Sequence, residues 1–212
     1  MSNNVSIIID GAVGAGKSTL MDILEDSGFT SFPEPVVDNP LLDKFYYDKK
    51  RYAFPLQIFF LNKRFAHLKS TKGHEKVACD RSIYGDEIFA KMLHESGDLT
   101  DEEYSIYKEL LENMLEHCEP PTLMIYLQIS VDAAVNRIQK RGRDYEQVVE
   151  KSYWEDLNIR YRDFFLSYNR SPLLVIDVSE LDFENNAEHK QIVVGKINEK
   201  LQELGHSVRI HN

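Results

Sequence analysis

Residues 5–20 of the chain read VSIIIDGAVGAGKSTL, a run of β-branched residues followed directly by a glycine-rich segment. The run at 5–9 is apolar apart from Ser6, which is typical of a strand covered on both faces. Residues 11–18 then fit the pattern G-x-x-x-x-G-K-[ST] without a mismatch, and residues 17–26 have the pattern of a helix that stops at Gly28. A strand, a phosphate-binding loop and a helix in this order predict an α/β fold with a nucleotide site near its N-terminus.

The glycine-rich segment has the chemistry of a triphosphate site. Its glycines let backbone N–H groups turn inward around phosphate oxygens, and the helix N-terminus adds partial positive charge. We expect the Lys17 side chain to reach the β- and γ-phosphates and the Ser18 hydroxyl to ligate Mg²⁺. The residues assigned to nucleotide binding on this basis are Gly11, Ala12, Val13, Gly14, Ala15, Gly16, Lys17, Ser18 and Thr19.

The rest of the chain alternates short apolar runs with helical patterns. Thr100 opens one helix with a capping box, and Ser130 is the predicted N-cap of another. Because no linker or repeat interrupts the alternation, we expect a single domain, residues 1–212, around a mostly parallel sheet. Further strands are predicted at 28–32, 77–79, 123–127 and 173–176, and further helices at 55–68, 100–117, 131–140, 148–168 and 188–204. The aromatic stripe of 148–168 is interpreted as core or oligomer contact.

Composition restricts the classes of partner. The chain has a formal net charge of −10, which disfavours broad electrostatic binding to nucleic acid or to an anionic membrane. It contains no run approaching the roughly 18 apolar residues that a membrane span needs. The N-terminus lacks the positive region of a signal peptide, and Cys79 and Cys118 make no disulfide framework. We therefore expect a cytoplasmic protein with reduced thiols.

Two acidic residues and a neighbouring arginine follow predicted strands. Glu34 precedes Pro35, which keeps Glu34 extended at the carboxyl edge of the sheet, where open α/β sheets bind ligands. Asp80 comes directly after the strand at 77–79, in a position that suits a Mg²⁺ ligand, directly or through water. Arg81 beside it can pair with Glu34 or with phosphate.

Four cations in seven residues stand out in a protein of net charge −10. Arg137 and Arg141 lie four residues apart on one helical face, and Lys140 and Arg143 complete the cluster around the helix breaker Gly142. A solvated helix end is one interpretation. The other is a lid that closes over the triphosphate and stabilises the charge that moves during transfer.

Together these motifs resemble the deoxynucleoside kinase family, which includes deoxycytidine, deoxyguanosine and deoxyadenosine kinases. The similarity runs from about residue 5 to 177, and the EPVVDNP stretch at 34–40 looks more like the bacterial deoxyadenosine/deoxyguanosine kinases than the mammalian enzymes. The resemblance implies a five-stranded parallel sheet of the P-loop NTPase type, with helices on both faces and an arginine-rich lid at about 137–147. It also implies that ATP with Mg²⁺ phosphorylates the 5′-hydroxyl of a deoxynucleoside, a reaction of nucleotide salvage.

The resemblance also implies roles for residues in the reaction. Glu34 matches the general base at the 5′-hydroxyl, and Arg81 matches the arginine beside that base. Asp80 fills the acidic position linked to Mg²⁺, where the mammalian enzymes have Glu. Lys17 acts on the transferred phosphoryl group, and the lid arginines are Arg137, Arg141 and Arg143.

A second set of matches concerns the nucleoside. Gln57 matches the glutamine that makes two hydrogen bonds to the base, and an amide offers the donor and acceptor that adenine or cytosine requires. Arg64 and Asp86 match a base-discriminating pair, which favours bases with an exocyclic amino group. The remaining matches are Tyr46 and Glu146 at the 3′-hydroxyl and Phe89 stacked on the base, with a spacing from Asp86 that is one residue shorter than in the mammalian enzymes. We predict deoxyadenosine as the first substrate, deoxyguanosine or deoxycytidine second, and thymidine as very poor.

The resemblance further implies a homodimer, formed by the helix at 55–68 with either 83–93 or 100–117. A phosphate loop also occurs in two other classes of protein. A nucleoside monophosphate kinase of the thymidylate kinase type shares the phosphate loop, but Tyr46 and Glu146 suit a free sugar better than a monophosphate. A GTP-binding switch protein should carry N-K-x-D, whereas residues 62–65 read NKRF and lie inside a predicted helix.

Overall fold

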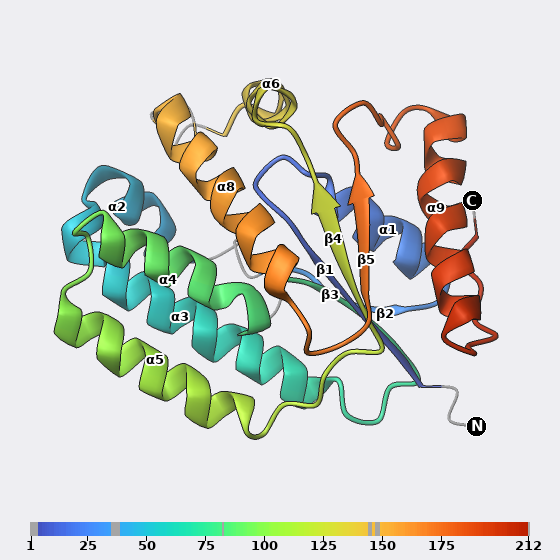
Figure 1. The fold of residues 1–212 in the computed structure, drawn as a ribbon, viewed down its shortest axis with the longest axis horizontal. Helices are drawn as coiled ribbons and strands as arrows, with labels where there is room; N and C mark the ends of the chain where they lie inside the picture. The colour runs from blue at the N-terminus through green and yellow to red at the C-terminus, as the bar shows by residue number, and fades with distance from the viewer. Residues whose placement is uncertain (1–3, 35–38, 82, 144–145, 147–148, 212) are drawn as a thin grey trace.

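The five predicted apolar runs form one sheet in which every strand pairing is parallel (Figure 1). The computed structural model of the 212-residue chain describes residues 4–34, 39–81, 83–143, 146 and 149–211. The strand order is β2-β3-β1-β4-β5, so the first strand lies in the middle and is buried on both faces, as predicted. The strands are β1 (Val5–Asp10), β2 (Thr30–Phe32), β3 (Lys76–Asp80), β4 (Leu123–Gln128) and β5 (Leu173–Asp177).

Helices cover both faces of this sheet, which confirms the predicted α/β architecture. In Figure 1, α1 (Lys17–Asp26) and α9 (Ala187–Glu203) lie on one side. The other side carries α3 (Lys49–Ser70), α4 (Asp86–Glu95), α5 (Asp101–Leu115) and α8 (Lys151–Ser167). The remaining helices are α2 (Leu42–Tyr47), which packs on α3, the 3-10 helix η1 (Ile83–Gly85), and α6 (Val131–Arg141), which lies beyond the carboxyl end of β4.

Local capping signals set several boundaries where the sequence predicts them. The Thr100 hydroxyl accepts a hydrogen bond from the Glu103 backbone N–H at 3.2 Å, and the Glu103 carboxylate accepts from the Thr100 N–H at 2.9 Å. Ser130 caps α6 by accepting from the N–H of Ala133 at 3.3 Å. Each cap satisfies a backbone donor that a helix N-terminus leaves unpaired, so these starts depend only on neighbouring residues.

The predicted start of the helix at 55–68 is wrong. Proline is favoured in the first turn of a helix, but here α3 begins at Lys49, and the Asp48 carboxylate accepts from the Arg51 N–H at 3.3 Å. Pro55 therefore lies inside the helix, where its ring removes one backbone hydrogen bond. The carbonyl of Arg51, four residues earlier, loses its helical partner, and this exposed side of the helix lets water replace it. The helix can therefore continue through Pro55.

The long helix predicted at 148–168 corresponds to α8, and residue 148 lies outside the described residues. Trp154, Leu157, Tyr161 and Phe165 are buried, so the aromatic stripe belongs to the core. Cys79 is buried and Cys118 half-buried, both as free thiols. Across the described ranges, none of the helices combines the length and hydrophobicity that crossing a membrane requires.

The parallel arrangement brings the strand ends together. The phosphate loop follows β1, Glu34 follows β2, and Arg81 follows β3, so three segments far apart in the sequence meet at one edge of the sheet. This edge is where an open α/β sheet holds its ligands.

Candidate active site

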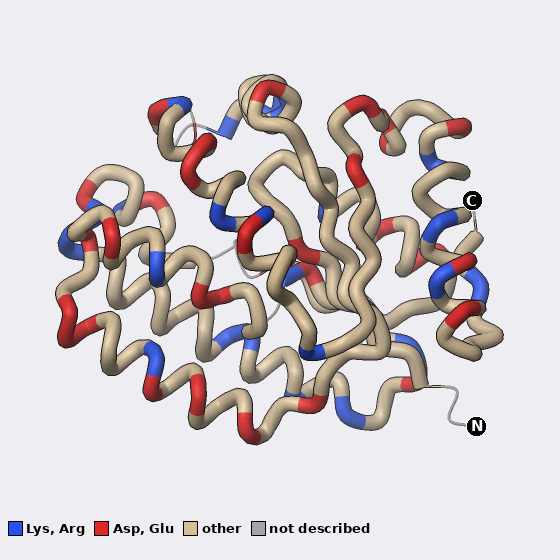
Figure 2. The backbone as a smooth tube through the Cα atoms, viewed as in Figure 1, with Lys and Arg blue, Asp and Glu red and all other residues tan. Residues whose placement is uncertain are grey.

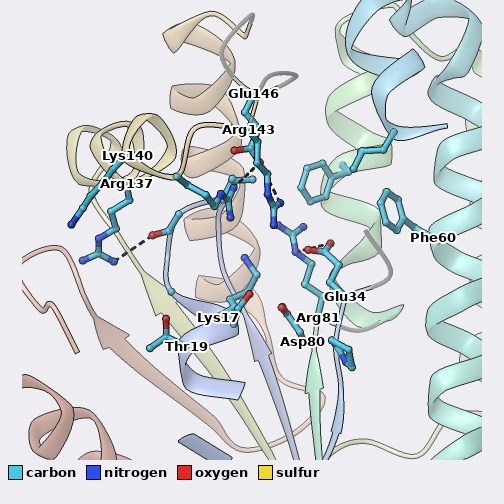
Figure 3. A pocket seen from close by; sticks show the side chains of 18 of the residues that line it. Lys17, Thr19, Glu34, Phe60, Asp80, Arg81, Arg137, Lys140, Arg143 and Glu146 are labelled. Atoms are coloured by element: carbon cyan, nitrogen blue, oxygen red, sulfur yellow. Dashed lines mark hydrogen bonds and ion pairs between the residues drawn. The ribbon is translucent and has the colours of Figure 1, made fainter. Parts of the chain in front are cut away.

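A cleft of about 940 Å³ opens at the carboxyl edge of the sheet (Figure 3). Its size is in the range of small-molecule sites. Most of the residues that the sequence predicts as functional line it: Val13, Gly14, Gly16, Lys17, Ser18, Thr19, Glu34, Tyr46, Gln57, Arg64, Asp80, Arg81, Asp86, Phe89, Arg137, Arg141, Arg143 and Glu146. Gly11, Ala12 and Ala15 belong to the same loop without lining the cleft. Residues 35–38 of the EPVVDNP stretch, residue 82 after Arg81, and residues 144, 145 and 147 of the predicted lid lie outside the described residues.

The phosphate loop is closed around its own lysine. Lys17 is buried, and its Nζ donates to the carbonyl oxygens of Gly11 at 3.0 Å and Ala12 at 3.1 Å. Burial and the charge of Arg81 lower the pKa of Lys17 to about 8. Gly16 caps α1 with φ 90°, and a Cβ there would lie 2.6 Å from the Phe183 ring. The loop therefore needs glycine both for its turn and for the close approach of Phe183.

A network of charged side chains lies in the cleft where the ends of β2 and β3 meet α3. The Glu34 carboxylate accepts a hydrogen bond from Arg64 Nη2 at 2.9 Å and forms an ion pair with Arg81 Nε at 3.2 Å. Arg64 also donates to the Asp86 carboxylate in a short contact. Glu34 comes from the end of β2, Arg64 from α3 and Arg81 from the end of β3, so the network joins three elements.

Arg81 is held in an unusual backbone conformation. Among the described non-glycine residues it alone has a positive φ, of 64°. Its N–H donates to the Ile9 carbonyl at 2.8 Å, and its Nη1 donates to the Tyr161 hydroxyl at 2.8 Å. The guanidinium also lies 4.9 Å from the centre of the Phe89 ring. Strain of this kind persists only where surrounding contacts hold it, and it is common at functional sites.

The acids of the cleft differ in how readily they ionise. Burial raises the pKa of Asp80 to about 6, although Lys17 opposes the shift. Burial likewise raises the pKa of Asp86 to about 7 against the charge of Arg64. Burial acts on Glu34 in the same direction, but Arg81 and Arg64 outweigh it and hold the pKa of Glu34 below its ordinary value. Glu34 is therefore a carboxylate at neutral pH, whereas Asp86 titrates there.

The cationic cluster at 137–143 makes two kinds of contact. Arg141 donates to the Glu146 carboxylate at 2.6 Å, and Arg143 forms an ion pair with it at 3.6 Å. Arg137 instead donates to three backbone carbonyls, those of Gly14, Val178 and Leu181, at 3.3, 2.7 and 3.1 Å. Arg137 thus links the phosphate loop to the turn after β5, while the other two arginines surround a buried acid (Figure 3).

Several lining residues were missed from the sequence. Phe60 shares a helical face with Gln57 and Arg64, and this 3-then-4 spacing is a signal that identifies it. The turn at 181–185 follows β5. Because open α/β sheets bind ligands at the carboxyl ends of their strands, the position of this turn also predicts that it lines the cleft. Tyr153 lines the cleft and Tyr161 bonds Arg81, yet their helix carries no local signal of either contact.

Comparisons with known proteins agree with this geometry. The model of the family described as deoxynucleoside kinase matches residues 7–202. A deoxyguanosine kinase of Lactobacillus johnsonii is 40% identical over 209 residues, covering 94% of this chain and 93% of that protein. A deoxyadenosine kinase of Lactobacillus acidophilus is 39% identical, covering 94% of this chain and 97% of that protein.

A solved structure of a similar protein holds a nucleotide. The deoxyadenosine kinase from M. mycoides with bound dATP matches with a TM-score of 0.81 at 34% sequence identity, covering 92% of this chain and 100% of that chain. The thymidylate-kinase-type and GTP-switch alternatives have no support from these matches. The chain belongs to the deoxynucleoside kinase family and is an ATP-dependent enzyme that phosphorylates a deoxynucleoside.

Proposed function

We propose that this kinase transfers the γ-phosphoryl group of ATP to the 5′-hydroxyl of deoxyadenosine in preference to other deoxynucleosides, with Glu34 as the general base. The observation that carries the proposal is the carboxylate of Glu34, which two buried arginines keep ionised in the same cleft as Lys17. An ionised carboxylate in this position suits a hydroxyl acceptor, because it accepts the proton as the new P–O bond forms.

The remaining charges suit the transferred group. Phosphoryl transfer depends mainly on positioning and on neutralising the phosphate charges. Lys17 acts on the β- and γ-phosphates from inside the loop, and Arg141 and Arg143, which line the same cleft, contribute further positive charge. Arg137 holds the loop itself through Gly14, and Arg81 orients Glu34 at the acceptor hydroxyl.

The residues present fit a Mg²⁺ ion bound together with ATP. Asp80 Oδ1 is buried and has no hydrogen-bond partner among the described residues, and Ser18 lines the same cleft. The described part of the chain contains no group of three or more side chains that would bind a metal alone. Mg²⁺ in such sites keeps few protein ligands and takes the rest from phosphates and water. Asp80 and Ser18 would hold it, and it would supply charge neutralisation at the phosphates.

The nucleoside side of the cleft supports a base with an exocyclic amino group. Gln57 is buried and faces the cleft, and the Asp86 carboxylate keeps Oδ2 without a partner among the described residues. We assign Gln57, Arg64 and Asp86 to the base edge, Phe89 to stacking, and Tyr46 and Glu146 to the 3′-hydroxyl. The relatives named deoxyguanosine kinase and deoxyadenosine kinase match at nearly equal identity. The site residues favour a base with an exocyclic amino group, and the choice of deoxyadenosine among such bases follows the resemblance to the bacterial deoxyadenosine/deoxyguanosine kinases.

Replacing Glu34 tests the general base. We expect Glu34→Gln to lower kcat by about 10²–10⁴-fold, the usual contribution of a general base, because the amide cannot accept the proton. ATP binding should remain nearly intact, since Glu34 lies at the acceptor end. Lys17→Ala is the contrasting variant and should abolish turnover through the phosphates. A loss below about fivefold in steady-state kinetics would mean that Glu34 is not the base.

The ionisation of Asp86 predicts a pH dependence of nucleoside binding. Below a pKa of about 7 the carboxyl carries a proton, and the protonated oxygen becomes a donor that cannot accept from the amino group of adenine, so affinity for deoxyadenosine should fall as pH falls. If only the ionised form binds, Kd rises by about tenfold from pH 8 to pH 6. Calorimetry without ATP measures this, with Asp86→Asn as the control that should show no slope. A flat wild-type profile, or a slope that persists in Asp86→Asn, would contradict the assignment.

Substrate preference is tested with four deoxynucleosides and adenosine, compared by kcat/KM. We expect deoxyadenosine first, deoxyguanosine or deoxycytidine second, and thymidine lower by about 5–150-fold, because an unpaired buried acceptor costs about 1–3 kcal/mol. Adenosine should be weak if Tyr46 packs against C2′. Thymidine as the best substrate would refute the role of Asp86, whereas deoxycytidine as the best would change only the base preference.

We also propose that two copies associate through the outer surfaces of α3 and α5. The two helices pack on each other, Ile58 and Phe59 of α3 are partly exposed, and Ile106 of α5 is 56% exposed. Light scattering should give twice the mass of one chain, and Ile106→Glu should shift it toward the monomer. A monomeric mass for the unmodified protein would refute the dimer.

A further inference from the structure

Asp10 does not line the cleft and has no role in the reaction proposed above. It is the last residue of β1 and is 1% exposed. Every other buried charged side chain in the described part of the chain lines the cleft, whereas Asp10 does not. Burying an ionisable group away from any ligand is costly, so its position calls for a structural reason.

The two oxygens of Asp10 contact two different segments. Oδ1 accepts a hydrogen bond from the N–H of Gly11, the first residue of the phosphate loop, at 2.8 Å. Oδ2 lies against Gly85, the last residue of η1, where a Cβ would be only 2.3 Å away. The Asp10 side chain therefore contacts both the phosphate loop and the segment after β3.

Gly85 is a glycine because of this contact and not because of its backbone. Its φ of −95° and ψ of −3° are open to any residue. The space for a side chain is instead taken by the Asp10 carboxylate. That carboxylate cannot swing away cheaply, because it is buried and held by the Gly11 N–H.

The segment that Gly85 belongs to carries two residues of the acceptor site. Arg81 lies four residues before it and Asp86 directly after it, as the first residue of α4. The Arg81 N–H also bonds to Ile9, the residue before Asp10, at 2.8 Å. Because Arg81 has a strained backbone, small shifts of the segment would move its guanidinium away from Glu34.

We propose that Asp10 is a positioning residue whose carboxylate, packed between the Gly11 N–H and Gly85, holds Arg81 and residues 83–86 in register with the phosphate loop. The proposal rests on the proposed function for the roles of Arg81 and Asp86. It explains why a buried acid lies where no substrate can touch it. In-line transfer needs donor and acceptor placed within a fraction of an ångström, and this contact connects the two sides through a single side chain.

The test is a double-mutant cycle between Asp10 and Gly85. Gly85→Ala alone should lower kcat/KM for deoxyadenosine by about tenfold or more, since overpacking displaces the segment. KM for ATP should change less, because the phosphate loop keeps its own backbone contacts. Asp10→Ala alone should also lower kcat/KM. Combining the two should recover at least about threefold over Gly85→Ala, because the new methyl group fits the space that the carboxylate leaves.

Three controls separate positioning from folding. Gly195→Ala adds the same methyl group in α9, where nothing lies within 4 Å, and should leave kcat/KM unchanged. Asp10→Asn keeps the shape and the acceptor for Gly11, so it should restore most of what Asp10→Ala loses. Asp10→Ser, which is small and retains an acceptor, replaces Asp10→Ala in the cycle if that variant does not fold. Thermal melting of every variant shows whether assays are run on folded protein.

The outcomes distinguish the positioning role of Asp10 from the proposed function. Losses that multiply in the double variant, an effect of Gly85→Ala below about twofold, or melting shifts without any change in kcat/KM would overturn the proposal. A loss in Asp10→Asn equal to that in Asp10→Ala would assign the effect to charge and would also overturn it. A wild-type enzyme that turns over deoxyadenosine while the cycle is additive leaves the proposed function standing. If the wild type does not turn over deoxyadenosine, the proposed function is refuted. A double variant that melts at a higher temperature than Gly85→Ala would then still show that Asp10 and Gly85 are in contact.

Discussion

The contact of Glu34 with Arg64 and Arg81 is the interaction on which the cleft depends. Glu34 is half-buried and the two arginines are buried, and charges removed from water are stable only when opposite charges or hydrogen bonds replace the water they have lost. Because the three side chains come from the end of β2, from α3 and from the end of β3, the contact also holds the helical layer against the sheet. Removing one partner from such a group typically costs about 3–5 kcal/mol, since the remaining charges stay buried.

Two sides of the cleft are built differently. The nucleotide side is mostly backbone, in the glycine loop and in the carbonyls of Gly14, Val178 and Leu181 that Arg137 connects. The acceptor side is mostly side chain, with the charges of Glu34, Arg64, Arg81 and Asp86 lining the cleft. Glu34 and Arg81 are labelled in Figure 3. Backbone groups suit a phosphate chain that every nucleotide shares, whereas side chains suit the choice among bases.

Charge is distributed unevenly between the surface and the cleft. Acidic residues appear along many of the outer helical surfaces in Figure 2, in keeping with the net charge of −10. Buried cations and the half-exposed Arg141 and Arg143 concentrate at the carboxyl edge of the sheet instead. The cleft can therefore attract a triphosphate that the rest of the surface would repel, and this attraction should weaken as salt is added.

The sequence by itself determined whatever depends on neighbouring residues: the phosphate loop, the strands, the Thr100 cap and the helical spacing of Gln57 and Arg64. Only the tertiary structure decided contacts between distant segments, such as Tyr161 with Arg81 or Asp10 with Gly85. It also overrode a local rule at Pro55, because α3 packs on α2 and its exposed turn tolerates the missing bond. Motifs report local backbone geometry and residue chemistry, whereas buried charges find their partners only when the strand ends meet at one edge.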